Sequence, residues 1–282
     1  ECLSNGVIPS AMEASLKSLA NAVDEDLLSL YKDIPYFAGT AGVTPSSSRN
    51  IANVRKVLND NLCFTAERRL VIDSEAEVEF LEAFKNAHET GSTAALREAN
   101  IGRLYNFDIF SDQLMPFHQS GTIIGKYVPI LSSNLSIGQN KMNISWGNPE
   151  RISINRGDLF KFAGFEDSFV AVNNYTSDAN GNFSEVEFYP PLPFEVPVNT
   201  SVNFIKSHVP NMAFNKNAFA LAMRTLSDEE SESSTISTMT DPVSGISLRL
   251  ETWRHSPKSA RHWRFDILYG VKTLRPELAA RM

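Results

Sequence analysis

The sequence contains few cysteines and no long apolar run. Only Cys2 and Cys63 occur among its 282 residues, too few for a disulfide framework, and no Cys/His spacing resembles a zinc site. We expect free thiols in a reducing compartment. No stretch approaches the roughly 18 consecutive apolar residues that cross a bilayer, and the N-terminus lacks the pattern of a signal peptide. Neither membrane insertion nor export is expected.

An excess of positive charge is also missing. The 26 Lys and Arg residues against 33 Asp and Glu residues give a formal net charge of −7, which disfavours nonspecific binding of nucleic acid by the chain as a whole. The hydrophobic fraction of 42% and the charged fraction of 21% are close to globular averages, so disorder and coiled coil are excluded. The length predicts one large domain with an insertion, or two domains.

Motifs for catalysis and cofactor binding are lacking. No histidine lies in a nucleophile elbow, and Gly121 and Gly125 are not followed by the Lys-Ser/Thr of a phosphate loop. His255 and His262 have no carboxylate pair at metal-ligand spacing. The histidines, which we expect in loops or at the surface, are His88, His118, His208, His255 and His262. We therefore expect no enzyme activity, no cofactor and no metal.

Helical periodicity dominates the first third of the chain. Apolar residues recur every three or four positions over Ser10–Tyr31, which predicts a long amphipathic helix, and Ser10 with Glu13 forms a capping box. The elements expected next are a helix over Ser48–Leu58, a strand over Arg69–Ile72, a helix beginning at Asp73 or Ser74 and a bending strand over Ile101–Met115. In the helix that begins at Asp73 or Ser74, the buried face is expected to contain Val78, Leu81 and Phe84.

The composition changes near Gln119, where helical periodicity gives way to turn residues and β-branched residues, and this lasts to about Pro210. Such a stretch predicts a small β-barrel or sandwich. The expected strands are Lys141–Trp146, Asp158–Phe162, Ser168–Asn173, Phe183–Phe188 and Ser201–Ile205. After Pro210 we expect a strand running into a short helix over Asn211–Leu226, a solvated loop over Ser227–Ser237, and a hairpin that pairs Ile246–Glu251 with Trp263–Tyr269.

The hairpin carries the one concentration of basic residues. These are Arg249, Arg254, Lys258, Arg261 and Arg264, interleaved with Trp253 and Trp263. Arginines beside aromatics are typical of nucleic-acid surfaces. The alternative, which we favour, is an exposed hairpin face that meets an acidic neighbour in an assembly. The candidates for inter-subunit contacts are accordingly Arg249, Arg254, Arg261 and Arg264.

Three stretches carry a more specific pattern. At the C-terminus, Gly245–Arg249 (GISLR) and a hairpin precede Arg264–Val271 (RFDILYGV) and Arg275–Ala279 (RPELA). Asn211–Leu221 (NMAFNKNAFAL) is the second stretch, and Asn155–Gly164 (NRGDLFKFAG) is the third. Together they resemble the major coat protein of tailed bacteriophages and prophages, of the kind that carries an extra β-domain inserted in the Hong Kong 97-type capsid fold. The third stretch contains Arg156-Gly157-Asp158, which spells an integrin-binding motif, but a tripeptide this short occurs by chance.

This resemblance implies an α+β fold in three parts. Residues 1–118 would form the spine helix and the peripheral domain, residues 119–210 the inserted, barrel-like β-domain, and residues 211–282 the C-terminal part of the axial domain with its β-hairpin. The family also carries an N-terminal arm and an extended loop. Because the chain begins at Glu1, almost at the spine helix, we expect upstream sequence to be missing.

The resemblance implies a structural function, in which no residue needs to be catalytic. Copies of the chain would form pentamers and hexamers and tile an icosahedral virion capsid, made in the cytoplasm of the bacterial host. Scaffolding and portal proteins are possible partners, and DNA would be a nonspecific content of the shell. The main alternative is a secreted or surface carbohydrate-binding protein, suggested by five Asn-x-Ser/Thr sequons and by Tyr127, Trp146 and Tyr189. A hydrolase with a non-standard site is a distant third.

Overall fold

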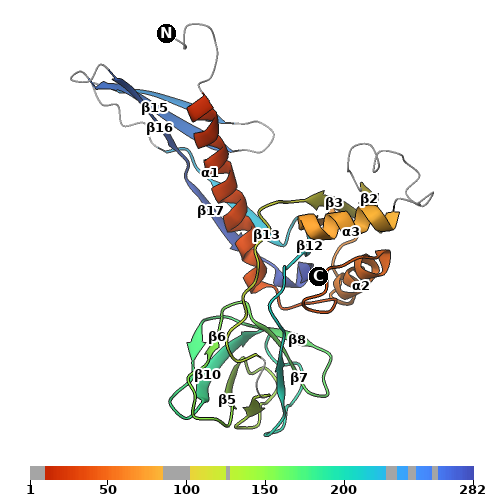
Figure 1. Cartoon of the computed structure of the whole chain (residues 1–282). Coiled ribbons are helices and arrows are strands. Elements are labelled where there is room, and N and C mark those ends of the chain that lie inside the picture. The colour runs from red at the N-terminus through yellow and green to blue at the C-terminus, as the bar shows by residue number, and fades with distance from the viewer. Residues whose placement is uncertain (1–9, 85–101, 125–127, 227–233, 241–245, 256–259) are drawn as a thin grey trace. The chain divides into compact units, whose positions relative to one another are not determined.

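The computed structural model describes residues 10–84, 102–124, 128–226, 234–240, 246–255 and 260–282. In these ranges the fold is mixed α+β, and its strands outnumber its three α-helices (Figure 1). The chain divides into two compact units. Unit 1 contains the described residues up to Leu27 and those of Phe219–Lys272, and unit 2 contains Leu28–Ala218 and Thr273–Met282.

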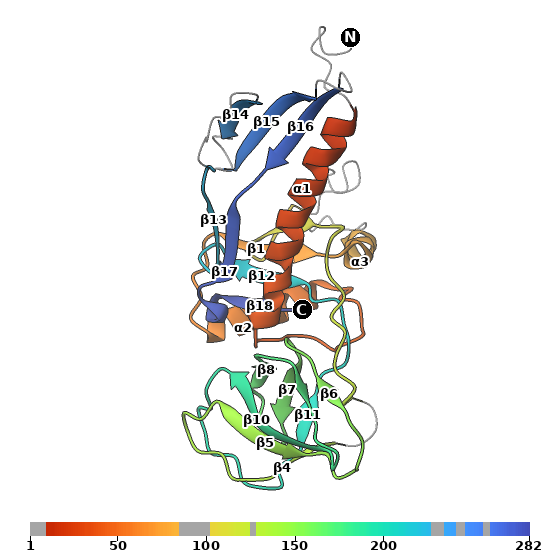
Figure 2. The ribbon, with the colours of Figure 1, turned by 90° about the vertical axis from the view of Figure 1, so that its left-hand side faces the viewer.

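Unit 1 combines a long helix with two small sheets. Helix α1 spans Ser10–Ser29, close to the predicted bounds. The sheets pair β13 (Phe219–Met223) with β17 (Tyr269–Thr273), and β14 (Ser234–Thr240) with β15 (Ser247–His255) and β16 (Ala260–Asp266). The Tyr269 hydroxyl donates to the Asp26 carboxylate at 2.6 Å, and α1 runs alongside β16 and β17 in both views (Figures 1 and 2). The predicted hairpin is confirmed as β15–β16, but its second strand ends at Asp266, and Tyr269 begins β17.

Two predictions in this region are wrong. The short helix expected within Asn211–Leu226 is strand β13, because pairing with β17 outweighs the helical preference of its alanine and leucine residues. The solvated loop expected over Ser227–Ser237 is wrong in its last part, since β14 begins at Ser234 and pairs with β15 along its whole length. Residues 227–233 lie outside the described part of the chain.

Unit 2 contains a five-stranded sheet, which we call the core sheet. Its strand order is β18-β12-β1-β3-β2, with β1 and β3 parallel and the other pairs antiparallel. The strands are β1 (Arg68–Ile72), β2 (Arg103–Leu104), β3 (Phe107–Ser111), β12 (Met212–Asn215) and β18 (Ala279–Arg281). Beside them lie α2 (Ser48–Asp60), α3 (Ser74–Phe84) and the 3₁₀ turns η2 (Leu30–Asp33) and η4 (Pro276–Leu278). The predicted second helix and first strand are confirmed.

The local details of this region differ from the predictions at two points. Helix α3 buries Ala76 and Phe80, and Val78 is 64% exposed, so the predicted buried face is wrong at Val78. Leu81 is half-buried, and the side chain of Phe84 lies outside the described part. The expected bending strand is two strands, β2 and β3. They form a hairpin that turns at Tyr105 and Asn106, both with positive φ, which reverses the chain where a bend was expected.

The strands of unit 2 between residues 130 and 204 form a second structure, which we call the β-body. The strands are β4 (Ile130–Leu131), β5 (Lys141–Ser145), β6 (Ser153–Ile154), β7 (Leu159–Phe162), β8 (Ser168–Ala171), β9 (Tyr175–Thr176), β10 (Asn182–Tyr189) and β11 (Val202–Phe204). Six of them form a sheet in the order β11-β7-β8-β10-β5-β4 (Figure 2). An antiparallel bridge between Ile130 and Ser201 joins its two edges, so the sheet closes on itself in the manner of a barrel.

The β-body has a large aromatic core. Phe160, Phe162, Phe169 and Phe188 are buried, and their ring centroids lie 5.3 to 6.3 Å apart in mostly edge-to-face pairs. All five predicted strands are present, whereas the short β4, β6 and β9 were missed. The compact units do not follow the predicted parts, because residues 211–282 are shared between the units. The three-part domain division stays a prediction.

Candidate functional site

The three-stranded sheet of unit 1 carries the predicted contact arginines. Arg249 and Arg264 are described with their side chains, whereas only the backbone of Arg254 and Arg261 is described. The register pairs Arg254 with Arg261 across the β15–β16 hairpin, and it pairs Arg249 with Asp266. The structure thus places all four on one hairpin, two of them directly opposite each other.

The two described arginines have different surroundings. Arg249 is only 16% exposed in its side chain, and its guanidinium lies 3.9 Å from the Glu251 carboxylate and 4.0 Å from that of Asp266. Arg264 is 61% exposed and donates from Nε to Asp266 Oδ1 at 2.8 Å. The expectation of a uniformly exposed basic face is therefore wrong for Arg249, whose charge faces two acidic groups of its own sheet.

Unit 1 has few fully buried apolar residues. Among its described residues only Val23, on α1, is fully buried, and the described apolar side chains of β15 and β16 are partly exposed. Met239 on β14 is 74% exposed, and Leu268 is 45% exposed. Folded units usually bury many apolar side chains, since that burial is the main favourable term in folding. Unit 1 therefore differs from the β-body, whose core contains many fully buried side chains.

A second site lies in unit 2, where the chain enters and leaves the β-body. His118 and His208 form an antiparallel bridge in which each backbone N–H donates to the other's carbonyl, at 2.9 and 3.2 Å. Tyr31 of η2, Asp158 and Arg281 of β18 surround this bridge. We call these five residues the polar joint. All of them are buried.

A continuous hydrogen-bond chain runs through the joint. The Tyr31 hydroxyl is 2.9 Å from His118 Nδ1, and His118 Nε2 is 2.9 Å from Asp158 Oδ1. Asp158 Oδ2 accepts from the backbone N–H groups of Gly121 and Asn155 at 3.0 and 2.8 Å. With the ring proton of His118 placed on Nε2, the Tyr31 hydroxyl donates to Nδ1 and Nε2–H donates to Asp158 Oδ1, so every one of these contacts joins a donor to an acceptor. The chain links η2 to the β-body.

The Arg-Gly-Asp tripeptide is the part of the β-body that docks on the rest of unit 2. The Arg156 guanidinium pairs with the Asp33 carboxylate at 2.7 Å. Gly157 accepts a hydrogen bond from Arg281 Nη1 at 2.9 Å through its carbonyl oxygen. Asp158 supplies the buried carboxylate of the joint. The three residues therefore have one structural role in this fold, which is to hold the β-body at η2 and β18.

Burial lowers the pKa values of two side chains of the joint, Arg281 and His208. It lowers the pKa of Arg281 to about 9, against the raising influence of Tyr31 and Asp158, and the guanidinium stays protonated at neutral pH. Burial also lowers the pKa of His208 to about 4, and the neighbouring charge of Arg281 acts in the same direction. His208 Nδ1 donates to the Lys206 carbonyl at 2.8 Å, while its Nε2 finds no partner among the described residues. His208 is therefore neutral at pH 7.

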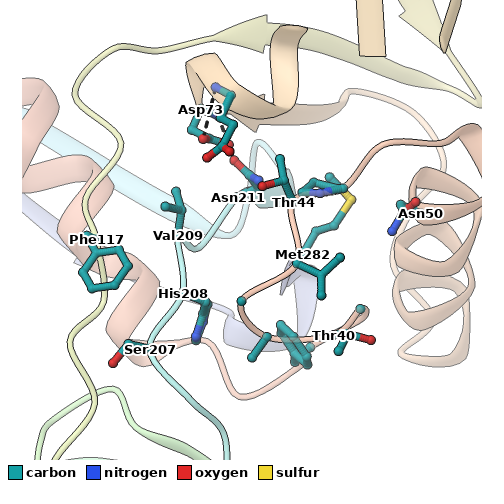
Figure 3. Close-up of a pocket in the computed structure, with 17 residues that line it drawn as sticks. Thr40, Thr44, Asn50, Asp73, Phe117, Ser207, His208, Val209, Asn211 and Met282 are labelled. Carbon is teal, nitrogen blue, oxygen red and sulfur yellow. Dashed lines mark hydrogen bonds between the residues drawn. The ribbon is translucent and has the colours of Figure 1, made fainter. Parts of the chain in front are cut away.

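A cavity of about 190 Å³ lies next to the joint (Figure 3). Its wall includes His208, Phe117 and Met282, together with the loop of residues 39–45 and the start of α3. Asn211 Oδ1 accepts from the Asp73 backbone N–H at 2.7 Å, which ties two parts of the wall together (Figure 3). The cavity has a mixed polar and apolar lining and no nucleophile paired with a base.

The joint is suited to holding the fold together rather than to catalysis. The order Tyr31–His118–Asp158 has the donor and acceptor sequence of a proton relay, but it ends on a phenol that is 3% exposed and that lies under the Arg281 guanidinium, 5.1 Å from the ring centroid. The loop or surface position expected for the histidines is wrong for His118 and His208, which are 2% and 5% exposed. Their positions at the two edges of the composition change were the available signal.

The structure also places Cys63 and Trp146. Cys63 is a buried free thiol, and burial raises its pKa. Trp146 lies in the core of the β-body and is 3% exposed, so its ring offers no sugar-stacking surface, and Tyr127 lies outside the described residues. Over the described ranges, no group of three His, Cys, Asp or Glu residues could hold a metal ion. None of the described helices is long and apolar enough to span a membrane.

Comparison with known proteins gives a structural likeness to a phage chain. No family model matches the sequence, and no curated protein matches it. Among solved structures, a chain from Mycobacterium phage Che8 aligns with 98% of this chain at 15% sequence identity and a TM-score of 0.45. The alignment covers 62% of that chain, so this protein corresponds to less than two thirds of its length.

Proposed function

We propose that this chain is a structural subunit of a tailed-phage capsid, which assembles with copies of itself into an icosahedral shell around the phage DNA. The observation that carries the proposal is the sparse burial of unit 1, where Val23 is the only buried residue among those described. A helix and a three-stranded sheet that bury so little within one chain gain stability when neighbouring chains cover them. The sequence resemblance of three stretches to phage coat proteins supports the same function.

In this proposal the contacts between copies lie on unit 1. Arg264 is the better of the two described arginines for reaching a neighbouring copy, because its side chain is 61% exposed whereas that of Arg249 is 16% exposed. Arg254 and Arg261 remain candidates. Exposed ion pairs contribute about 0 to 1 kcal/mol each, so they would align copies while apolar contacts supply most of the affinity. The proposal needs no catalytic residue, metal or cofactor.

The test is to express the product of the whole gene, alone and with a scaffolding protein from the same genome, and to examine it by electron microscopy. Closed shells with pentamers and hexamers are the expected result. Particles would be made in the host cytoplasm, with a portal protein at one vertex. A product that stays monomeric under both conditions, or that binds an immobilised glycan instead, would contradict the proposal.

A further inference from the structure

The polar joint contains the two connections between the core sheet and the β-body, which we call the crossings. A buried cluster of titratable side chains surrounds them. The chain passes between the core sheet and the β-body at His118 and again at His208, and the two crossings hydrogen-bond to each other. The side chains of the same two residues lie in contact, with ring centroids 5.5 Å apart. A change in ionisation of either ring therefore acts directly on both crossings.

His208 is the member of the joint that has no hydrogen-bond acceptor for an added proton among the described residues. Its ring packs on Phe37, with centroids 5.6 Å apart, and its Nδ1 is already occupied by the Lys206 carbonyl. A proton added at the buried Nε2 would find no acceptor among the described residues. It would also create a second buried cation near Arg281, which itself has Nε and Nη2 without described acceptors. Such a charge is expensive to bury.

The groups that face His208 from the surrounding elements mostly oppose its protonation. Arg281 on β18 and His118 on the other crossing disfavour the charged form, and Asp158 favours it. The Asp158 carboxylate is already held by His118 and two backbone N–H groups. The Tyr31 hydroxyl hydrogen-bonds His118. At the cavity, Asp73 and Glu75 belong to the same wall as His208, and no hydrogen bond joins either of them to its ring.

We propose that the joint is an acid-sensitive latch, in which protonation of His208 separates the two crossings and frees the β-body from the core sheet while both keep their own folds. The β-body has its own aromatic core, so its strands do not depend on the latch. The latch is closed at neutral pH and opens as the solution becomes acidic. It does not depend on the proposed capsid function and can be measured on the isolated chain.

The direction and size of the effect follow from proton linkage. In the open joint His208 has its ordinary pKa of 6.5, and in the closed joint it has a pKa of about 4. Because the open form takes up a proton that the closed form excludes, the closed state is fully favoured above pH 6.5 and loses stability as the pH falls from 6.5 towards 4. The equilibrium constant for opening rises about twenty-fold between pH 7 and pH 5.

Hydrogen exchange followed by mass spectrometry tests the latch on the whole chain. After correction for the intrinsic pH dependence of amide exchange, peptides that contain His118 and His208 should exchange about twenty-fold faster at pH 5 than at pH 7. Peptides from β7, β8 and β12 should keep their protection. In His208→Asn, which retains a donor for the Lys206 carbonyl but cannot titrate, the corrected rates should be equal at the two pH values.

Two further variants keep the test decisive. His208→Phe also removes the titrating group and keeps a ring against Phe37, so it replaces His208→Asn if the latter does not fold. His262→Asn, on the sheet of unit 1, is the matched histidine control and should behave like the unchanged chain. Equal corrected exchange at both pH values in the unchanged chain would overturn the proposal. So would a pH effect that survives both His208 variants, or simultaneous loss of protection in β7, β8 and β12.

Discussion

Gly157 shows how strongly a single position of the Arg-Gly-Asp loop is constrained. Its φ is +94°, and a Cβ built on it would lie 3.0 Å from Lys32 Cγ and 3.2 Å from Lys32 Cα. Its carbonyl oxygen accepts a hydrogen bond from buried Arg281. Gly157 therefore has a positive φ, lies close to Lys32 and accepts a buried hydrogen bond. Only glycine adopts this φ and fits this close to Lys32 without strain.

The Gly157→Ala substitution should consequently destabilise the chain by about 2 to 4 kcal/mol. Gly164 is a matched control, because its φ of +88° is similar but no atom lies within 4 Å of the position of its Cβ. Gly164→Ala should carry only the backbone strain, about 1 to 2 kcal/mol. Urea unfolding of both variants measures the difference. Equal losses would show that the contact with Lys32 does not constrain Gly157.

At the scale of elements, the contrast lies between the sheets of the two units. The six-stranded sheet surrounds a dense set of phenylalanine rings, whereas the three-stranded sheet of unit 1 has no fully buried residue among those described. In β8, Phe169 is wholly buried and touches three other rings of the core cluster. In β16, Phe265 is half-buried and lies opposite Leu250. Removing each ring should therefore have a different effect.

We expect Phe169→Ala to lower the free energy of unfolding by about 3 to 5 kcal/mol, since it leaves a cavity in a packed core. Phe265→Ala should lower it by about 1 to 2 kcal/mol in the isolated chain, because that ring is not fully buried and lies outside a packed aromatic core. Denaturant unfolding followed by circular dichroism measures both. A larger loss for Phe265→Ala would show that unit 1 has an internal core that the burial pattern does not reveal.

At the scale of the whole molecule, the proposed assembly makes different demands on exposed apolar residues of the two units. Met239 on β14 in unit 1 is 74% exposed, and Ile137 in the β-body is 65% exposed. Both positions can accept a charge in the single chain without burying it. Only Met239 lies on the unit that we propose to be covered by neighbouring copies.

Met239→Asp should therefore leave the thermal unfolding of the isolated chain unchanged and reduce shell yield at least tenfold, because a buried carboxylate without a partner opposes association. Ile137→Asp, the matched control, should assemble normally. Sedimentation of the product of the whole gene under assembly conditions gives both yields. Normal shells with Met239→Asp, or loss of shells with Ile137→Asp alone, would remove unit 1 from the interface.

Local sequence patterns were sufficient for most elements of the fold. The long helix, the second helix, the strand at Arg69 and the five main strands of the β-body follow from hydrophobic periodicity and turn residues, since these report which face of an element is buried. The same patterns failed where a partner strand decides the outcome. Phe219–Met223 has residues that suit a helix, and it is a strand because β17 pairs with it.

Tertiary contacts decided the polar joint. Tyr31, His118, Asp158, His208 and Arg281 are far apart in the sequence, and no spacing rule connects them, so each was uninformative alone. They meet because the crossings of the β-body lie against η2 and the last strand. Composition and periodicity determine which segments become helices, strands and a separate β-body. Which polar side chains share a buried space depends on how those segments pack, because hydrogen bonding and burial act between atoms that only the folded chain brings together.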